Sequence, residues 1–162
     1  MKLNRTALSD LGFDGFLPLR KILLAPFEVP DKFGIYAVIR TNQGTPAFLP
    51  ESRAARFRNR DLSYPVGRLL DKWIPMAQVI YIGKAGPTVG RHLRRRINEF
   101  VRFGDGTAIG HRGGRAIWQL PDVWECLLAW KACSGIPRES EKQLIAEFKQ
   151  AHGKIPFANF TE

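Results

Sequence analysis

The chain has 162 residues and a formal net charge of +10, from 25 Lys and Arg against 15 Asp and Glu. Hydrophobic residues make up 44% of it, which is enough for a packed core and excludes a wholly disordered basic tail. The entire charge excess lies in residues 53–115, where 12 Arg and 2 Lys stand against 4 acidic residues. This distribution favours a polyanionic partner such as nucleic acid.

Several classes of protein are excluded by what the sequence lacks. No window of about 18 apolar residues exists, so we expect no transmembrane helix. Residues 1–14 carry no long apolar core, so we expect no signal peptide and a cytoplasmic location. Cys126 and Cys133 have no His at ligand spacing, which argues against a structural zinc site. Unpaired thiols are a simpler interpretation than a disulfide, which stays open.

The first half of the chain predicts two strands separated by a long insertion. Residues 1–32 mix short apolar runs with prolines and predict a lead-in with one short helix. Residues 33–40 alternate between two faces, as in a strand, and residues 79–82 form a second apolar strand. The intervening 41–78 is too long for a hairpin loop and carries a short helix near 66–73, so we interpret it as an insertion with structure of its own.

The second half predicts two helices and a third strand. Apolar residues recur at helical spacing in 93–103, and a Gly-rich loop follows at 108–115. Residues 124–131 are a strand candidate, and Pro137–His152 is a helix with Pro early and Gly just after it. The order predicts an α+β fold in which helices flank a small three-stranded antiparallel sheet, all within one domain of residues 1–162.

One acidic residue lies on the wrong face of the 137–152 helix. At about 100° per residue, Leu144, Ile145 and Phe148 form an apolar stripe, and Glu141 falls inside it. A buried carboxylate is costly unless it is paired or binds a metal, so Glu141 is a candidate functional residue. Its place in the first turn, where a negative charge meets the helix N-terminus, is the alternative explanation. That alternative accounts for its axial position but not for its face.

The arginines of the 93–103 helix lie on two different faces of the helix. Arg94 and Arg96 flank the apolar stripe, whereas Arg95 and Arg102 face outward. Either flanking arginine could reach a cleft beside the sheet, and helix geometry alone does not choose between them. The outward pair suits contacts to backbone phosphates or forms an ordinary solvated face.

Five short motifs occur in a fixed order along the chain. Gly34-Ile35-Tyr36 opens the first predicted strand, and Tyr81-Ile82-Gly83 ends the second. They are followed by Leu-Arg-Arg-Arg-Ile at 93–97, by Glu141 with apolar residues three and four positions later, and by Pro-Phe-Ala-Asn at 156–159. In this set and order the chain resembles the GIY-YIG endonuclease family over about residues 30–160. The 44 residues between the two triplets form a longer linker than is usual in that family.

The resemblance implies a GIY-YIG-like nuclease fold and metal-dependent hydrolysis of phosphodiester bonds in DNA, with RNA left open as a substrate. It implies Mg²⁺, or Mn²⁺, held by Glu141, since one carboxylate plus waters suits a hard ion. Tyr36 would act on the attacking water, and Tyr81 would position water or phosphate. Arg96 would bind the scissile phosphate with two parallel hydrogen bonds, which Lys does less well.

Two further residues are candidates for the catalytic group. Lys84, directly after the second triplet, would lower a tyrosine pKa or hold phosphate, with a solvated turn residue as the alternative. His111, in the Gly-rich loop, would act as an acid, a base or a phosphate ligand, with an ordinary surface position as the alternative. Residues expected to contact nucleic acid are Arg94, Arg95, Arg102, Arg112, Arg115 and Asn159.

A second interpretation belongs to a different class: a nucleic-acid-binding module that keeps the fold but does no chemistry. The Arg-rich segment alone would support it, whereas the intact motifs count against it. The insertion could be a DNA-contacting lid, a specificity element or an oligomer interface. Its Arg53, Arg56, Arg58 and Arg60 favour a DNA contact, with a solvated run as the alternative. The chain has three His without paired spacing and no Walker loop, so other metal-nuclease designs and nucleotide hydrolysis fit less well.

Overall fold

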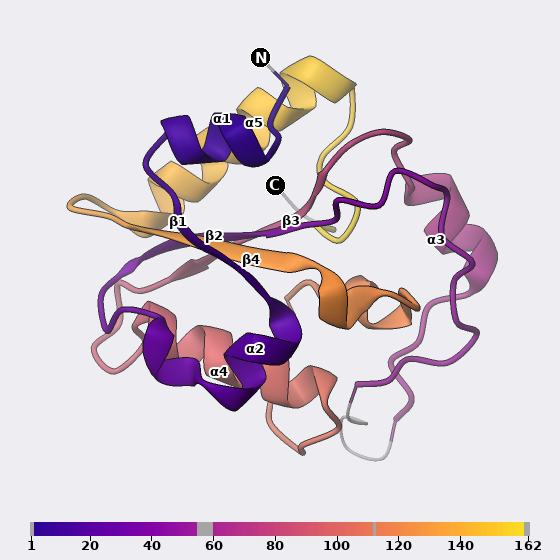
Figure 1. Cartoon of the computed structure of the whole chain (residues 1–162), viewed down its shortest axis with the longest axis horizontal. Coiled ribbons are helices and arrows are strands. Elements are labelled where there is room, and N and C mark those ends of the chain that lie inside the picture. The colour runs from indigo at the N-terminus through magenta and orange to yellow at the C-terminus, as the bar shows by residue number, and fades with distance from the viewer. Residues whose placement is uncertain (1, 55–59, 112, 161–162) are drawn as a thin grey trace.

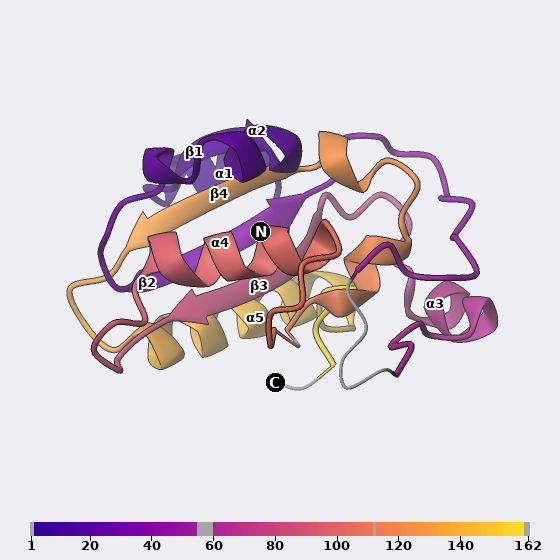
Figure 2. The same ribbon diagram turned by 90° about the horizontal axis from the view of Figure 1, so that it is seen from below.

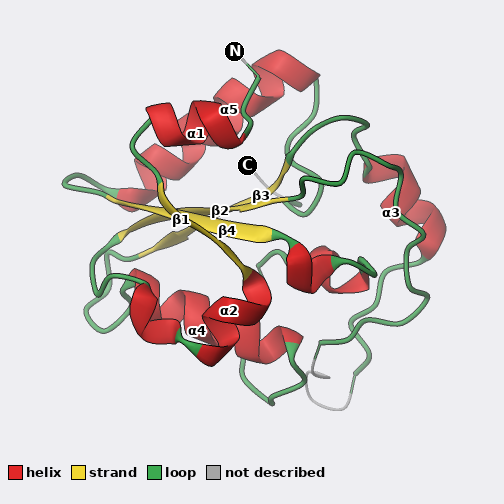
Figure 3. Cartoon of the chain, viewed as in Figure 1, coloured by secondary structure: helices red, strands yellow, loops and turns green. Residues whose placement is uncertain are grey.

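The computed structural model describes residues 2–54, 60–111 and 113–160. It is an α+β fold (Figures 1 and 3). The strands are β1 (Asp14–Pro18), β2 (Gly34–Ile39), β3 (Val79–Ala85) and β4 (Leu127–Ala132). The α-helices are α1 (Arg5–Asp10), α2 (Leu19–Leu24), α3 (Val66–Lys72), α4 (Leu93–Gly104) and α5 (Pro137–His152). Short 3-10 helices lie at Pro26–Glu28, Arg115–Gln119 and Val123–Glu125.

The sheet has four antiparallel strands in the order β1-β4-β2-β3, one more strand than the sequence predicts. The additional strand, β1, comes from the lead-in. It lacks the alternation of a regular strand because Gly15 and Phe16 both have positive φ and the register shifts between Gly15 and Leu17. Gly15 also has no room for a side chain, since a Cβ there would lie 2.5 Å from the Trp130 ring.

The sheet separates two hydrophobic layers. Figure 1 shows α1 and α5 on one face and α2 and α4 on the other, and Figure 2 shows α4 in front of the sheet with α5 behind it. The alternation predicted for β2 is confirmed, because Ile35 and Ala37 join the α5 core whereas Tyr36 joins the α4 core. β3, which carries the second triplet, is an edge strand.

The lead-in holds two α-helices, α1 and α2, and a 3-10 helix, where the sequence predicts one short helix. The predicted elements after residue 32 agree with the structure to within a few residues. The α5 bounds match the prediction, and α4 runs one residue further, to Gly104. β3 extends three residues past the predicted end, to Ala85, because its whole length pairs with β2. β4 begins three residues late, since the 3-10 helix Val123–Glu125 precedes it.

The insertion is anchored to the rest of the fold by buried polar side chains. Gln119 is fully buried; its amide oxygen accepts from the Tyr64 N–H, and its amide nitrogen donates to the carbonyls of Leu49 and Tyr64. Arg40, also buried, donates to Asp122 and to two carbonyls at the start of the insertion. The described parts of the insertion, residues 41–54 and 60–78, are therefore anchored to the rest of the fold.

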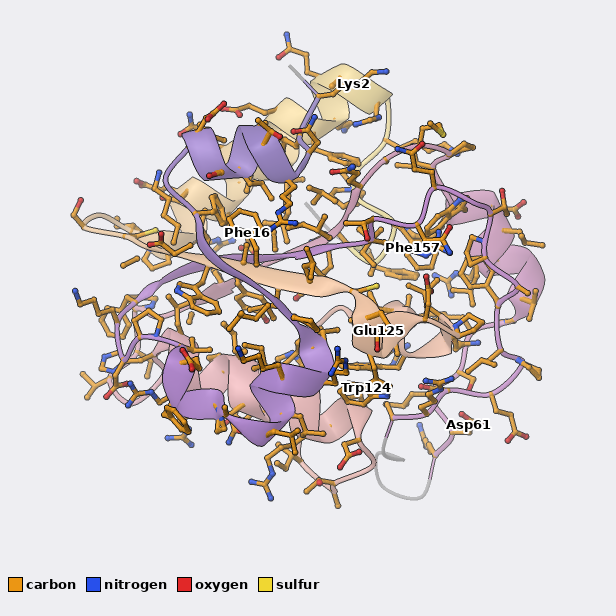
Figure 4. The ribbon with its side chains drawn as sticks, in the orientation of Figure 1. Lys2, Phe16, Asp61, Trp124, Glu125 and Phe157 are labelled. Carbon is orange, nitrogen blue, oxygen red and sulfur yellow. The ribbon has the colours of Figure 1, made fainter. Side chains whose placement is uncertain are left out.

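An aromatic cluster joins the insertion to the C-terminal segment. The Phe157 ring lies 5.4 Å from Phe48 and 5.2 Å from Trp73, centroid to centroid, and Phe157 is labelled in Figure 4. Among the described residues no helix is long and apolar enough to cross a membrane. Cys126 and Cys133 are both free thiols, as the sequence favoured.

Candidate active site

A cavity of about 410 Å³ lies along the edge strand β3. Segments distant in sequence meet around it: β3, the insertion, the 113–115 loop, the start of α5 and the C-terminal segment. Its walls combine basic, aromatic and apolar side chains, with a single carboxylate among the lining residues that the structure describes. The lining includes Tyr64, Tyr81, Lys84, Arg115, Glu141 and Asn159.

The single carboxylate of the cavity is Glu141. It is half-buried, and burial raises its pKa, while the charges of Lys84 and Arg138 act in the opposite direction. Within the described residues Glu141 makes no hydrogen bond or ion pair. The helical wheel thus located a carboxylate whose oxygens stay available to a ligand.

Lys84 connects this cavity to a second one. It lies opposite Ile35 in the β2–β3 register and lines both the Glu141 cavity and a polar cavity of about 290 Å³ that also holds Arg91 and Arg96. The charge of Lys84 acts on Glu141, whereas the charges that act on the two motif tyrosines are those of Arg96, Glu141 and Glu99. A substrate that spans both cavities would pass Lys84.

The two motif tyrosines form a buried pair. Tyr36 and Tyr81 are 1% and 7% exposed, and their ring centroids lie 5.9 Å apart. Burial raises the pKa of Tyr36 to about 12, against the lowering effects of Arg96 and of a hydrogen bond from Tyr81. The pKa of Tyr81 is raised further, chiefly by burial and then by Tyr36. Both are therefore neutral phenols at neutral pH.

The glycines of the motifs make room for these rings. Tyr36 stands opposite Gly83 in the register, and a Cβ at Gly83 would lie 2.5 Å from the Tyr36 Cζ atom. Gly114, with φ +69°, packs against the Tyr81 ring, where a Cβ would approach to 2.9 Å. The second triplet thus supplies one tyrosine and the space for the other.

Arg96 is the arginine of α4 that faces this site. It lies in the second cavity, donates to Glu99 Oε2 at 2.6 Å, and its charge lowers the pKa of Tyr36. Arg94 instead donates its Nε–H to the carbonyl of Val29 at 2.8 Å. Tertiary contacts therefore separate two arginines that the helical wheel could not.

His111 is buried beside the same group. It is 3% exposed, and its ring centroid lies 5.2 Å from that of Phe100. Within the described residues neither ring nitrogen has a hydrogen-bond partner of standard geometry. Burial, and next the charge of Arg96, lower the pKa of His111 to about 4, so it is neutral at pH 7. The alternative of an ordinary surface histidine does not hold.

The residues expected to contact nucleic acid are distributed unevenly. Arg115 lines the Glu141 cavity, and Arg102 is exposed on α4. Arg95 bonds the Gly90 carbonyl and Glu99. The side-chain amide of Asn159 both donates to and accepts from the Ile82 backbone, which fastens the C-terminal segment to the free edge of β3. Arg112 lies outside the described residues, as do Arg56 and Arg58 of the insertion.

Sequence reasoning missed four residues that line the cavity: Tyr64, Arg138, Lys142 and Phe160. Arg138 and Lys142 could have been found, because they lie three residues before and one after Glu141 on the same helix. Tyr64 and Phe160 gave no local signal, since each reaches the cavity through a contact distant in sequence.

The donor set fits a hard divalent ion that keeps much of its water. Glu141 offers unpaired carboxylate oxygens inside a cavity, and oxygen ligands suit Mg²⁺ and Mn²⁺. No cluster of three or more His, Cys, Asp or Glu side chains occurs in the described part of the chain, so a fully protein-ligated site of the zinc type is not found there.

Comparison with known proteins adds no relative. No protein-family model, no curated protein and no solved structure matches the chain. The function is therefore inferred from the residues around β3.

Proposed function

We propose that the protein is a metal-dependent endonuclease that hydrolyses phosphodiester bonds of DNA, with a GIY-YIG-like fold. The observation that carries the proposal is the gathering of Tyr36, Tyr81, Lys84, Arg96 and Glu141 around one edge strand. These residues come from β2, β3, α4 and α5, and are spread over more than half of the chain. A purely structural role does not explain an unpaired carboxylate in a basic cavity.

Each residue has a role that its surroundings support. Arg96 presents a guanidinium in the second cavity for bidentate binding of the scissile phosphate. Lys84, between the two cavities, balances the negative charge that develops on the phosphate oxygens. Glu141 would hold Mg²⁺ or Mn²⁺, which when bound polarises the phosphate and activates water.

The tyrosines act in their neutral form. With its pKa near 12, Tyr36 orients the attacking water through its hydroxyl oxygen and does not carry a standing negative charge. Tyr81, whose ring packs edge-on against that of Tyr36, holds the Tyr36 ring in place. His111, with its pKa lowered to about 4, is neutral at pH 7, so beside Arg96 it would serve as a neutral hydrogen-bonding group to phosphate or water.

The experiment is plasmid nicking with Mg²⁺, with EDTA as the metal-free control. Removing a metal ligand or a phosphate-binding group costs about 10²–10³-fold in rate, so we expect Glu141→Ala and Arg96→Ala each to lose at least this much. Glu139→Ala is the matched control, because Glu139 is an exposed carboxylate on the same helix. Full activity of Glu141→Ala, or no cleavage of linear, nicked and branched DNA or of RNA, would contradict the proposal.

A nucleic-acid-binding module without chemistry is the second candidate, favoured by the basic lining of both cavities. It predicts binding whose affinity falls steeply with salt, without any metal-dependent product. The two candidates are separated by the same nicking assay, since only the endonuclease gives products that vanish with EDTA.

A further inference from the structure

The part of the insertion that reaches the cavity is held rigidly. Tyr64 is 9% exposed, and its backbone N–H and carbonyl both bind the buried Gln119 side chain. Its ring stacks on Phe160, with centroids 4.6 Å apart and an interplanar angle of 11°. Arg68 lies 5.0 Å from the centroids of both rings. The aromatic pair therefore has a fixed place relative to the core.

This fixed ring holds Arg115. The Arg115 Nε–H donates to the Tyr64 hydroxyl oxygen at 2.7 Å, and the guanidinium carbon lies 4.6 Å from the ring centroid. A hydrogen bond and a cation–π contact to one ring restrict the guanidinium to one orientation. Within the described residues its remaining N–H groups make no hydrogen bond, which leaves four donors for a ligand.

The free donors face a ligand site. Arg115 and Glu141 line the same cavity, as do Arg138 and Lys142. This gives three cationic side chains on the walls beyond Lys84, more than one scissile phosphate requires. A polymer with regularly spaced phosphates is the ligand that uses such an extended basic lining.

We propose that the segment of the insertion around Tyr64 forms a fixed wall of the Glu141 cavity, on which Tyr64 positions Arg115 to bind a backbone phosphate next to the scissile one. Tyr64 is a positioning residue and touches the substrate only through Arg115. The inference rests on the proposed function, because it needs a phosphodiester strand in the cleft.

The test measures binding of a fluorescein-labelled DNA duplex in EDTA, where no cleavage occurs, over a range of salt concentrations. Loss of one phosphate contact lowers the slope of log K against log salt by about 0.9. We expect this loss in Arg115→Ala, with a fall in affinity of about tenfold, since the variant loses a charge-assisted hydrogen bond to phosphate. Tyr64→Phe keeps the ring and removes the hydroxyl, so we expect about a three- to tenfold fall from the lost orientation.

A double-mutant cycle decides whether Tyr64 acts through Arg115. Tyr64→Phe should have no further effect when Arg115 is already Ala. In steady-state cleavage it should raise KM and leave kcat unchanged, which a general loss of structure would not do. Lys21→Ala is the control for loss of one positive charge. Lys21 is exposed on α2, which packs next to β1, the edge strand opposite β3.

The outcomes separate this inference from the proposed function. Wild-type affinity and KM in Tyr64→Phe, or additive effects of the two substitutions, would overturn the positioning role even in an active nuclease. If Tyr64→Phe and Arg115→Ala lower DNA affinity non-additively but the wild-type protein never cleaves DNA, the positioning of Arg115 by Tyr64 would be supported and the endonuclease activity refuted. Absence of DNA binding by the wild-type chain would overturn both.

Discussion

The insertion and the β3 edge both hold polar side chains away from full solvent exposure, but these side chains differ in how many hydrogen bonds they make. Gln119 and Arg40, which anchor the insertion, are 0% and 5% exposed, and each makes three or more hydrogen bonds. Around the β3 edge, the half-buried Glu141 and Lys84 and the buried His111 make none of standard geometry with any described residue. Burial of a polar group is thus common to both regions.

What differs is the unused capacity for hydrogen bonds. A polar group without a partner costs free energy when it is buried, as it does among the described residues at Trp73 Nε1 and Trp118 Nε1 in the core, and several such groups beside a cavity mark a candidate ligand site. The hydrogen bonds of Gln119 and Arg40 make them structural residues, whereas the β3 edge is the candidate functional region. The comparison predicts that substitutions in the two regions change stability in opposite directions.

The largest effect on stability is expected at Gln119. Gln119→Ala leaves the Tyr64 N–H and two carbonyls without partners, at about 1–3 kcal/mol for each buried group. We expect the free energy of unfolding, measured in urea, to fall by about 3 kcal/mol or more. Gln43→Ala is the matched control, since Gln43 is an exposed glutamine of the same insertion. Equal stabilities of the two variants would remove the distinction between the regions.

Gln119 also shows where prediction from sequence stops. Its partner Tyr64 lies 55 residues earlier, and no local pattern connects them. Glu141, in contrast, was found from sequence, because a helical wheel needs only the ten residues around it. The same limit explains why the wheel left Arg94 and Arg96 equivalent: the carbonyl of Val29 that binds Arg94 is 65 residues away.

The fold was predictable where the local pattern is regular. The α5 bounds and the two faces of β2 follow from periodicity, and both are confirmed. β1 was missed because Gly15 and Phe16 adopt positive φ and interrupt the alternation that marks a strand.

The next largest effect concerns the pH dependence of stability, through His111. Its pKa is about 4 when folded and about 6.5 when unfolded, so the unfolded chain takes up a proton first as the pH falls. Stability is therefore lost between pH 6.5 and 4, by about 2 kcal/mol on going from pH 7 to pH 5. We expect His111→Gln to lose that part of the pH dependence in urea unfolding. His92→Gln, a half-buried histidine bonded to Asp31, should keep it.

The smallest effect has the most direct bearing on the comparison. Burial raises the pKa of Glu141, so its ionised form at neutral pH is less favourable in the folded chain than in the unfolded one. Stability is then lost as the pH rises from the unfolded pKa through the folded pKa. We expect Glu141→Gln to raise the melting temperature slightly at pH 7 while abolishing cleavage, and the gain to vanish below the unfolded pKa.

The control is Glu139→Gln, an exposed carboxylate of the same helix, which should leave the melting temperature unchanged. A fall in melting temperature for Glu141→Gln would mean that Lys84 and Arg138 stabilise the carboxylate by more than burial costs, so that Glu141 belongs with the structural ion pairs. A rise accompanied by loss of cleavage would show that the fold gives up stability to keep this carboxylate, because a residue retained at a cost to folding is retained for its chemistry.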